Sequence, residues 1–200
     1  MLDLVTPLDE LFPERGLRPG TVVAVGGRTG STSLLLGLLA GPLSAGSWGA
    51  VVGVPGLGAE AAAKLGVNLE HLALVPLFGP AGLHGPPEFA GARWPEVAAV
   101  LLDGLDVVAL RPPGQCPPSD ARRLAARARE ARSVLLLAAA AQAWPEPVDI
   151  ELVVTATGWH GLEAGHGALA YRTMEVRSSG RRGASRERRV QLLLPAPGGG

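Results

Sequence analysis

The sequence predicts a single α/β domain of three layers, in which helices cover both faces of a mostly parallel sheet. Its 200 residues are 47% hydrophobic, which is enough for one full core and argues against extended disorder. Short runs rich in Val, Leu and Ala alternate with longer helical stretches, and Gly or Pro separates them. Because alternating strands and helices form parallel sheets, we expect one domain over residues 1–194 and a flexible tail over 195–200.

The first half of the chain opens with a short helical turn over residues 8–12, which Pro13 ends. The strands expected next are short, apolar and bounded by turn residues, and they cover 21–25, 49–54 and 72–77. The helices expected between them cover 31–39 and 59–65. The first of these is apolar and should close near Gly41-Pro42, and the second ends at Gly66, a natural left-handed C′ residue.

The second half of the chain continues the alternation after a Gly- and Pro-rich stretch, 78–93, which we expect to be a loop. The expected helices cover 94–103 and 119–132, and the expected strands cover 106–110, 133–137 and 150–156. Pro95 suits a first helical turn, and Ser119-Asp120 suit a helix cap. Two further segments, 171–177 and 188–194, resemble antiparallel strands around residues 178–180 (SSG), so the sheet should gain an antiparallel extension.

A glycine turn lies between the first buried strand and the first long helix, where a phosphate-binding loop would stand. It consists of Gly26, Gly27, Arg28, Thr29, Gly30, Ser31 and Thr32. A P-loop reads G-x-x-x-x-G-K-[ST], whereas here Ser31 replaces the lysine and the loop is one residue short, so the P-loop is degenerate. Two interpretations stay open: an anion site at Arg28 and Thr29 on the helix N-terminus, or a tight turn kept for packing, which we favour.

Other pieces of the chain, taken in order, resemble the RecA-like recombinase core. They are Leu8-Asp9, residues 16–20 (GLRPG), residues 64–72 (KLGVNLEHL) and residues 105–110 (LDVVAL). The resemblance covers roughly residues 8–194 and implies a RecA-like fold. More closely, the chain resembles the short actinobacterial ImuA-type (ImuA′) proteins, RecA-related accessory factors of the damage-inducible mutasome. Those proteins act beside ImuB and an error-prone polymerase.

The departures from RecA fall on the positions that carry its chemistry. In alignment with that family, the P-loop lysine falls on Ser31, the catalytic glutamate on Val54 and the Walker B aspartate on Arg111. Arg111 puts a positive charge where Mg²⁺ would bind, and Val54 has no group that activates water. The resemblance therefore implies a protein without a catalytic residue, nucleotide cofactor or metal. Arg111 itself either contacts a partner or pairs with a nearby carboxylate, Asp103 or Asp106.

Positive charge is concentrated near the C-terminal end, although the formal net charge of the whole chain is zero. Residues 171–189 hold seven arginines and two glutamates, and such a segment can face an anionic partner. The candidate partner or DNA contacts are Trp159, Leu162, Arg177, Arg181, Arg182, Arg186, Arg188 and Arg189. A solvated turn is the competing interpretation. For the arginine-rich helix over 119–132, we prefer a solvated outer face.

Several classes of protein do not fit the composition. The single Cys116 excludes an internal disulfide and a cysteine-based zinc site, and the four histidines lack the spacing of metal ligands. Two of them, His160 and His166, stand among glycines and are expected in a loop. No signal peptide is visible, and the longest apolar stretches are too short to span a bilayer. We therefore expect a cytoplasmic protein with no membrane association.

The altered RecA positions predict a non-enzymatic protein, and the resemblance to ImuA-type proteins implies that it is a scaffold of a translesion-synthesis complex. The resemblance implies an ImuB-like partner, with the error-prone polymerase reached indirectly, and the C-terminal strands are the expected partner surface. Three alternatives stay open: a nucleotide binder that does not hydrolyse, a cell-division regulator of the SulA type, and a DNA binder acting through phosphate contacts. A weak DNA contact and a contact with RecA itself remain open within the scaffold interpretation as well.

Overall fold

The computed structural model of the chain describes residues 1–77, 93–160, 171–181 and 185–195. Within these residues, eight strands form one sheet in the order β10-β9-β8-β3-β7-β6-β4-β5. The strands of this sheet are β3 Val22–Gly26, β4 Gly49–Val52, β5 Leu72–Val75, β6 Val107–Leu110, β7 Val134–Leu137, β8 Ile150–His160, β9 Tyr171–Gly180 and β10 Arg188–Pro195. The strands β3 to β8 run parallel, and β9 and β10 extend the sheet in antiparallel fashion. The expected fold class is confirmed.

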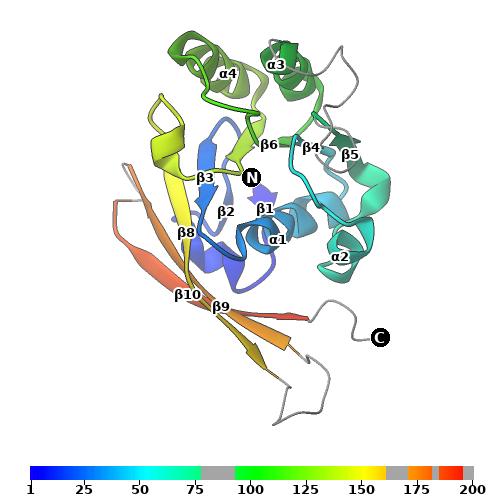
Figure 1. Cartoon of the computed structure of the whole chain (residues 1–200), viewed down its shortest axis with the longest axis vertical. Coiled ribbons are helices and arrows are strands. Elements are labelled where there is room, and N and C mark those ends of the chain that lie inside the picture. Colours follow the sequence, from blue (N-terminus) through cyan, green and yellow to red (C-terminus); the bar gives the residue numbers. More distant parts are fainter. Residues whose placement is uncertain (78–92, 161–170, 182–184, 196–200) are drawn as a thin grey trace.

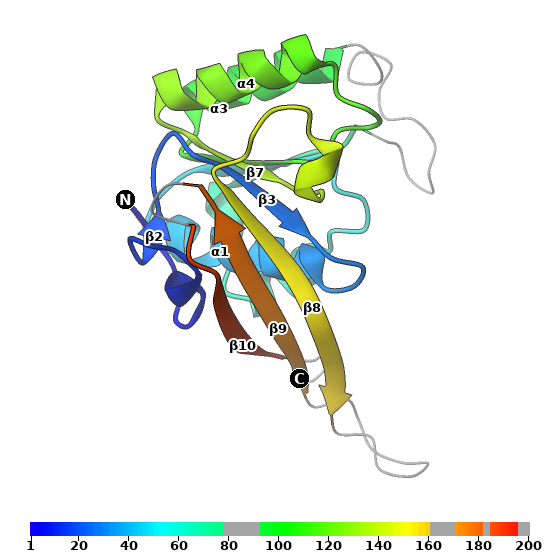
Figure 2. The same ribbon diagram turned by 90° about the vertical axis from the view of Figure 1, so that its left-hand side faces the viewer.

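Helices cover the two faces of the sheet (Figures 1 and 2). One face carries α1 Ser31–Ser44 and α2 Ala59–Lys64, and the other carries α3 Trp94–Gly104 and α4 Pro118–Ala131. The strand residues alternate between the layers, so that Val23 packs with the α1 layer and Val22 with the α4 layer. This alternation explains why the central strands read as continuous apolar runs: both faces are buried.

A second, small sheet and a 3-10 turn lie beside the α1 layer. The turn, η1 Leu8–Leu11, matches the expected helical turn, whereas β1 Leu2–Asp3 and β2 Gly16–Leu17 were not expected as strands. They are two residues long and pair only with each other, which leaves no alternating pattern to detect. Leu8 and Leu11 are buried with Leu192 of β10, so the N-terminal segment packs under the antiparallel extension.

Two helix ends differ from the prediction. The first helix does not close near Gly41-Pro42 but continues through Pro42 to Ser44, because its last turn buries Leu43 completely in the core. In α4, the residue before the helix is Pro117, and no side chain caps it. Ser119 and Asp120 therefore lie within the first turn instead of capping it. Gly66 does take the left-handed conformation expected after α2, with φ +84°.

Strands β8 and β9 are longer than predicted and project past the rest of the sheet (Figure 2). His160, which was expected in a loop, ends β8 and pairs with Tyr171 of β9. Residues 178–180, expected as a turn, belong to β9. The pairing of two long antiparallel neighbours extends both strands, and a local sequence pattern does not reveal this. Most of the predicted loop over 78–93 lies outside the described residues. His166 and the tail beyond Pro195 also lie outside them.

Candidate functional site

The degenerate P-loop forms the expected strand–turn–helix unit at the carboxyl end of β3. Gly26 ends the strand, and Ser31 begins α1. Gly27 and Gly30 have φ values of +133° and +94°, which L-residues rarely adopt, so the turn needs glycine at both positions. The side chains of Arg28 and Thr29 are exposed. The turn thus keeps the place of a phosphate loop between a strand and a helix.

The same glycines are in close contact with other elements. A Cβ atom on Gly26 would lie 3.2 Å from the Cα of Ala140, and one on Gly27 would lie 2.9 Å from the Cβ of Val154 in β8. A Cβ on Gly30 would collide with the guanidinium of Arg172 in β9. The turn is therefore packed against the antiparallel extension and the segment after β7. This supports the interpretation of a tight turn kept for packing.

Arg172 is the functional-site residue that sequence reasoning did not single out. It is 8% exposed, and its guanidinium lies against Gly30 at the N-terminus of α1. Burial lowers the pKa of this guanidinium, because removal from water disfavours the charged form. Its strand position carried a signal: in β9 it shares a face with the buried Met174 and Val176. An arginine in phase with core residues is expected to be buried.

Two of the three positions that align with RecA's catalytic groups are brought together by the sheet. Val54 and Arg111 follow the neighbouring strands β4 and β6, and the backbone N–H of Arg111 donates to the carbonyl of Val52 at 2.9 Å. Ser31 lies farther along the same edge, because β7 separates β3 from β6. This is the edge where ligands bind in open parallel sheets. The alignment with the RecA family thus selected residues from one edge of the sheet.

Arg111 is exposed, and neither expected carboxylate pairs with it. The carboxylate of Asp103 accepts a hydrogen bond from Arg127 at 2.6 Å. The Oδ2 of Asp106 instead accepts a hydrogen bond from the backbone N–H of Trp48 at 2.8 Å. Of the two interpretations considered for Arg111, pairing with these aspartates is therefore wrong.

Among the residues that the structure describes, those that directly follow the strands at this edge contain no carboxylate. They are residues 27–30, 53–58, 76–77, 111–117 and 138–145. Glu151, near the start of β8, reaches one of these segments, but its Oε1 accepts a hydrogen bond from the N–H of Ala141 at 3.2 Å. Across the described part of the chain, no group of three or more His, Cys, Asp or Glu residues is arranged to hold a metal ion. A magnesium ion would find no carboxylate in these segments.

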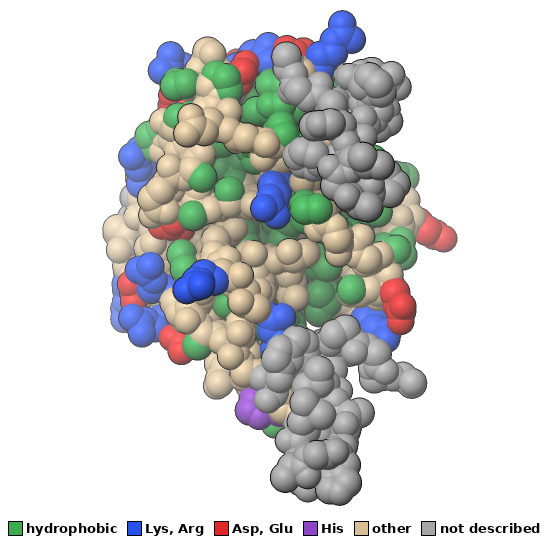
Figure 3. Space-filling model, viewed as in Figure 1, with side chains coloured by type: hydrophobic (Ala, Val, Ile, Leu, Met, Phe, Trp, Pro, Cys, Tyr) green, Lys and Arg blue, Asp and Glu red, His purple; other side chains and the backbone are tan. Residues whose placement is uncertain are grey.

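The arginines of the C-terminal segment are divided among different environments. Arg177 and Arg189 both bind Glu187, with N–O distances of 3.2 and 2.8 Å, and these hydrogen bonds lower the pKa of Glu187. Arg188 donates to the carbonyl of Arg186 at 3.3 Å. On the face shown in Figure 3, basic side chains lie in separate places, with acidic side chains beside several of them. A single free basic patch is thus not formed by these described residues.

The remaining candidate contacts are placed as follows. Arg181 ends the extension and lines a hollow with residues of the N-terminal segment and α4. Trp159 belongs to β8, and its side chain is outside the described structure, as are Leu162 and Arg182. On α4, exposed arginines surround a buried apolar stripe that includes Leu124, and Arg122 pairs with Glu146 at 3.3 Å. This bears out the preference for a solvated outer helix.

The chain has a RecA-like fold. It resembles the crystal structure of the RadB recombinase with a TM-score of 0.62 and 16% identity, covering 96% of this chain and 94% of that one. It also resembles the flagellar accessory protein FlaH from Methanocaldococcus jannaschii, with a TM-score of 0.55 and 12% identity over 89% and 85% of the two chains. At such low identity the likeness establishes the fold and nothing about activity.

The chain belongs to the family of the MT3502 N-terminal domain, whose model matches residues 10–146. It is also 38% identical over 122 residues to a Mycobacterium tuberculosis protein named uncharacterized protein Rv3395c. The match covers 60% of this chain and 52% of that protein, so the chain spans about half the length of its curated relative. No described helix has the length and apolar character needed to cross a membrane.

Proposed function

We propose that the chain is a RecA-like accessory protein that does not hydrolyse nucleotides and acts by protein–protein association. The observation that carries this is the sheet edge where RecA-like folds bind their ligand. The described residues that directly follow its strands hold no carboxylate, and Arg111 is exposed there where an aspartate would help to hold Mg²⁺. Without a metal and a group that activates water, phosphoryl transfer loses its main sources of transition-state stabilisation.

We further propose that the partner is an ImuB-like protein of a damage-inducible translesion complex in the cytoplasm. The sequence resemblance to ImuA-type proteins supports this partner, and the exposed outer face of the antiparallel extension supports the surface. On that face Leu193 is 70% exposed, although it lies on a regular strand beside Thr173. Farther along the same face, Glu175 and Arg189 make an ion pair at 3.9 Å. An interface with an apolar core and a polar rim would bury this leucine.

The chain offers a matched pair of variants for this test. Leu193 on β10 and Val100 on α3 are both 70% exposed, but they lie on different elements of the fold. We expect Leu193→Glu to weaken binding to a purified ImuB-like protein by about tenfold or more, as removal of an interface anchor does. Val100→Glu should leave the affinity unchanged. Equal effects of the two variants, or no binding by the unmodified chain, would contradict the proposed surface or partner.

A separate measurement tests the proposed lack of hydrolysis. Phosphate release from ATP with Mg²⁺ should equal that of a blank without protein, at protein concentrations well above those used for active RecA-like enzymes. Steady turnover that follows the protein through purification and is lost on heating would refute this part of the proposal. The binding of the partner does not depend on the result, so the two parts can fail independently.

One observation favours a second candidate, a nucleotide binder without hydrolysis. The guanidinium of Arg172 lies against Gly30 beside the first turn of α1, so it can supply a positive charge where Ser31 has replaced the lysine. This candidate predicts micromolar binding of labelled ATP that does not need Mg²⁺ and is lost in Arg172→Met. The scaffold proposal predicts no saturable binding in either protein.

A further inference from the structure

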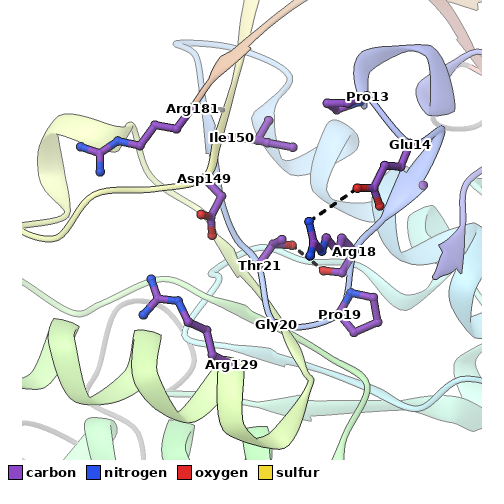
Figure 4. A pocket seen from close by; sticks show the side chains of 11 residues that line it. Pro13, Glu14, Arg18, Pro19, Gly20, Thr21, Arg129, Asp149, Ile150 and Arg181 are labelled. Atoms are coloured by element: carbon purple, nitrogen blue, oxygen red, sulfur yellow. Dashed lines mark hydrogen bonds and ion pairs between the residues drawn. The ribbon is translucent and has the colours of Figure 1, made fainter. Parts of the chain in front are cut away.

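A hollow of about 320 Å³ opens at the amino ends of β3 and β8, opposite the end of β3 that carries the glycine turn. Figure 4 shows it from close by. Its walls come from the N-terminal segment, the start of β8, the last turn of α4 and the end of β9. Neither the degenerate P-loop nor the outer face of the extension contributes to it. Any ligand here is therefore distinct from the partner and the nucleotide discussed above.

Two arginines approach this hollow from different elements. Arg129 belongs to α4 and Arg181 follows β9, and Figure 4 shows them on either side of Asp149, with both guanidinium groups to the left of it in the view. The backbone holds both in place. Gly20 has φ +86°, and a Cβ there would lie 3.3 Å from the Cα of Arg129. The N–H of Arg181 donates to the carbonyl of Asp149 at 3.0 Å.

The acidic groups of the hollow are already engaged. Glu14 pairs with Arg18 at 3.6 Å, and the Oδ2 of Asp149 accepts a hydrogen bond from the N–H of Val22 at 2.9 Å. Neither Arg129 nor Arg181 makes an ion pair with any residue that the structure describes. The lining thus holds three arginines and two carboxylates, with two guanidinium groups available to an incoming anion.

We propose that this hollow binds the phosphate group of a small molecule. Guanidinium groups match the geometry of phosphate oxygens, and two of them entering from different elements can hold one phosphate between them. The side chains of Pro13, Pro19 and Ile150 line the same hollow and form an apolar wall for the uncharged part of the ligand. The volume lies at the lower end of the range of about 300–1,000 Å³ that is usual for small-molecule pockets.

The test uses the full chain and inorganic phosphate, followed by the broadening of the ³¹P NMR line at constant ionic strength. We expect saturable binding, weakened about tenfold or more in Arg129→Gln and in Arg181→Gln, because each variant removes one set of charge-assisted hydrogen bonds. Arg122→Gln is the matched control. It removes the same charge from an exposed residue of α4 that does not line the hollow, so the affinity should not change.

Two further titrations identify the source of the anion. Acetate should compete poorly with phosphate, and competition at equal concentration would overturn the preference for phosphate. A short single-stranded oligonucleotide that binds while inorganic phosphate does not would overturn the small-molecule proposal and assign the arginines to a nucleic-acid backbone. Absence of binding in all titrations would show that the hollow is a solvated surface depression without a ligand. So would an equal loss of phosphate affinity in Arg122→Gln. A melting curve of each variant verifies that it is folded.

Discussion

Replacing Gly30 by alanine should destabilise the fold more than the same change at another glycine with equal backbone strain. Gly30 has φ +94°, and an added Cβ would collide with the guanidinium of Arg172 and lie 3.0 Å from the Sδ of Met174. Gly46 has φ +97°, and an added Cβ there would meet nothing within 4 Å. The two variants therefore share the backbone cost and differ in the packing cost.

The expected magnitudes follow from these contacts. An L-residue at positive φ costs about 1–2 kcal/mol, which is the whole expected effect of Gly46→Ala. At Gly30 the new methyl group must also displace a buried side chain, and overpacking of this kind adds about 1–3 kcal/mol. For a domain of this size, each kcal/mol lowers the melting temperature by about 2–4 °C. Gly30→Ala should thus melt several degrees below Gly46→Ala.

The assay is urea unfolding of both variants. The free energies of unfolding are compared where the two variants have the same dependence on urea concentration, the m-value. A double-mutant cycle adds Arg172→Ala, which removes the displaced side chain and should recover most of the extra loss at Gly30. Equal destabilisation by Gly30→Ala and Gly46→Ala would refute the reasoning, since it would mean that the extension does not pack on the turn. Additive effects of Gly30→Ala and Arg172→Ala in the double-mutant cycle would refute it as well.

Three other measurements test the structure more simply. Leu38→Ala should cost about 2–5 kcal/mol of unfolding free energy, because Leu38 is fully buried in the α1 layer; a loss as small as that of an exposed residue would contradict its placement. Burial, followed by the charge of Asp120, raises the pKa of Cys116 to about 11, so the folded state holds this proton longer than the unfolded state. The contribution of this thiol to the free energy of unfolding is fully present below pH 9 and is lost as the pH rises toward 11. Cys116→Ala should therefore make the free energy of unfolding less dependent on pH between these values. Glu187→Gln removes the carboxylate that pairs with Arg177 and Arg189, so elution from a heparin column should need more salt, and unchanged elution would argue against a basic surface there.

Much of the fold was predictable because it follows from local pattern. The central strands and α1 are apolar runs between turn residues, and α4 has a buried apolar stripe, so the strands of the large sheet and the four α-helices were found within a few residues. The errors arose where contacts between residues far apart in the sequence decide where an element ends. The strand β8 continues to His160 because β9 pairs with it along its whole length, and α1 passes Pro42 because Leu43 is needed in the core.

The candidate site divides in the same way. Gly30 was recognisable from its place between a strand and a helix, and Val54 and Arg111 from the order of RecA-like segments. Arg172 was missed, since it lies far from Gly30 in sequence and a buried arginine is rare. The basic C-terminal segment was visible as charge, but its division between Glu187 and the hollow at Arg129 depends on the register of β9 with its neighbours.

The sequence by itself determined the order of strands and helices and the chemical types available in each strand-end segment. It therefore decided that no carboxylate occurs in residues 27–30, 53–58, 76–77, 111–117 and 138–145, which follow strands at the ligand-binding edge, since composition does not change on folding. Only the tertiary structure decided which charges meet. Arg172 reaches Gly30, and Arg129 reaches the same hollow as Arg181, because sheet order and strand register bring distant segments together, and these are properties of the whole fold.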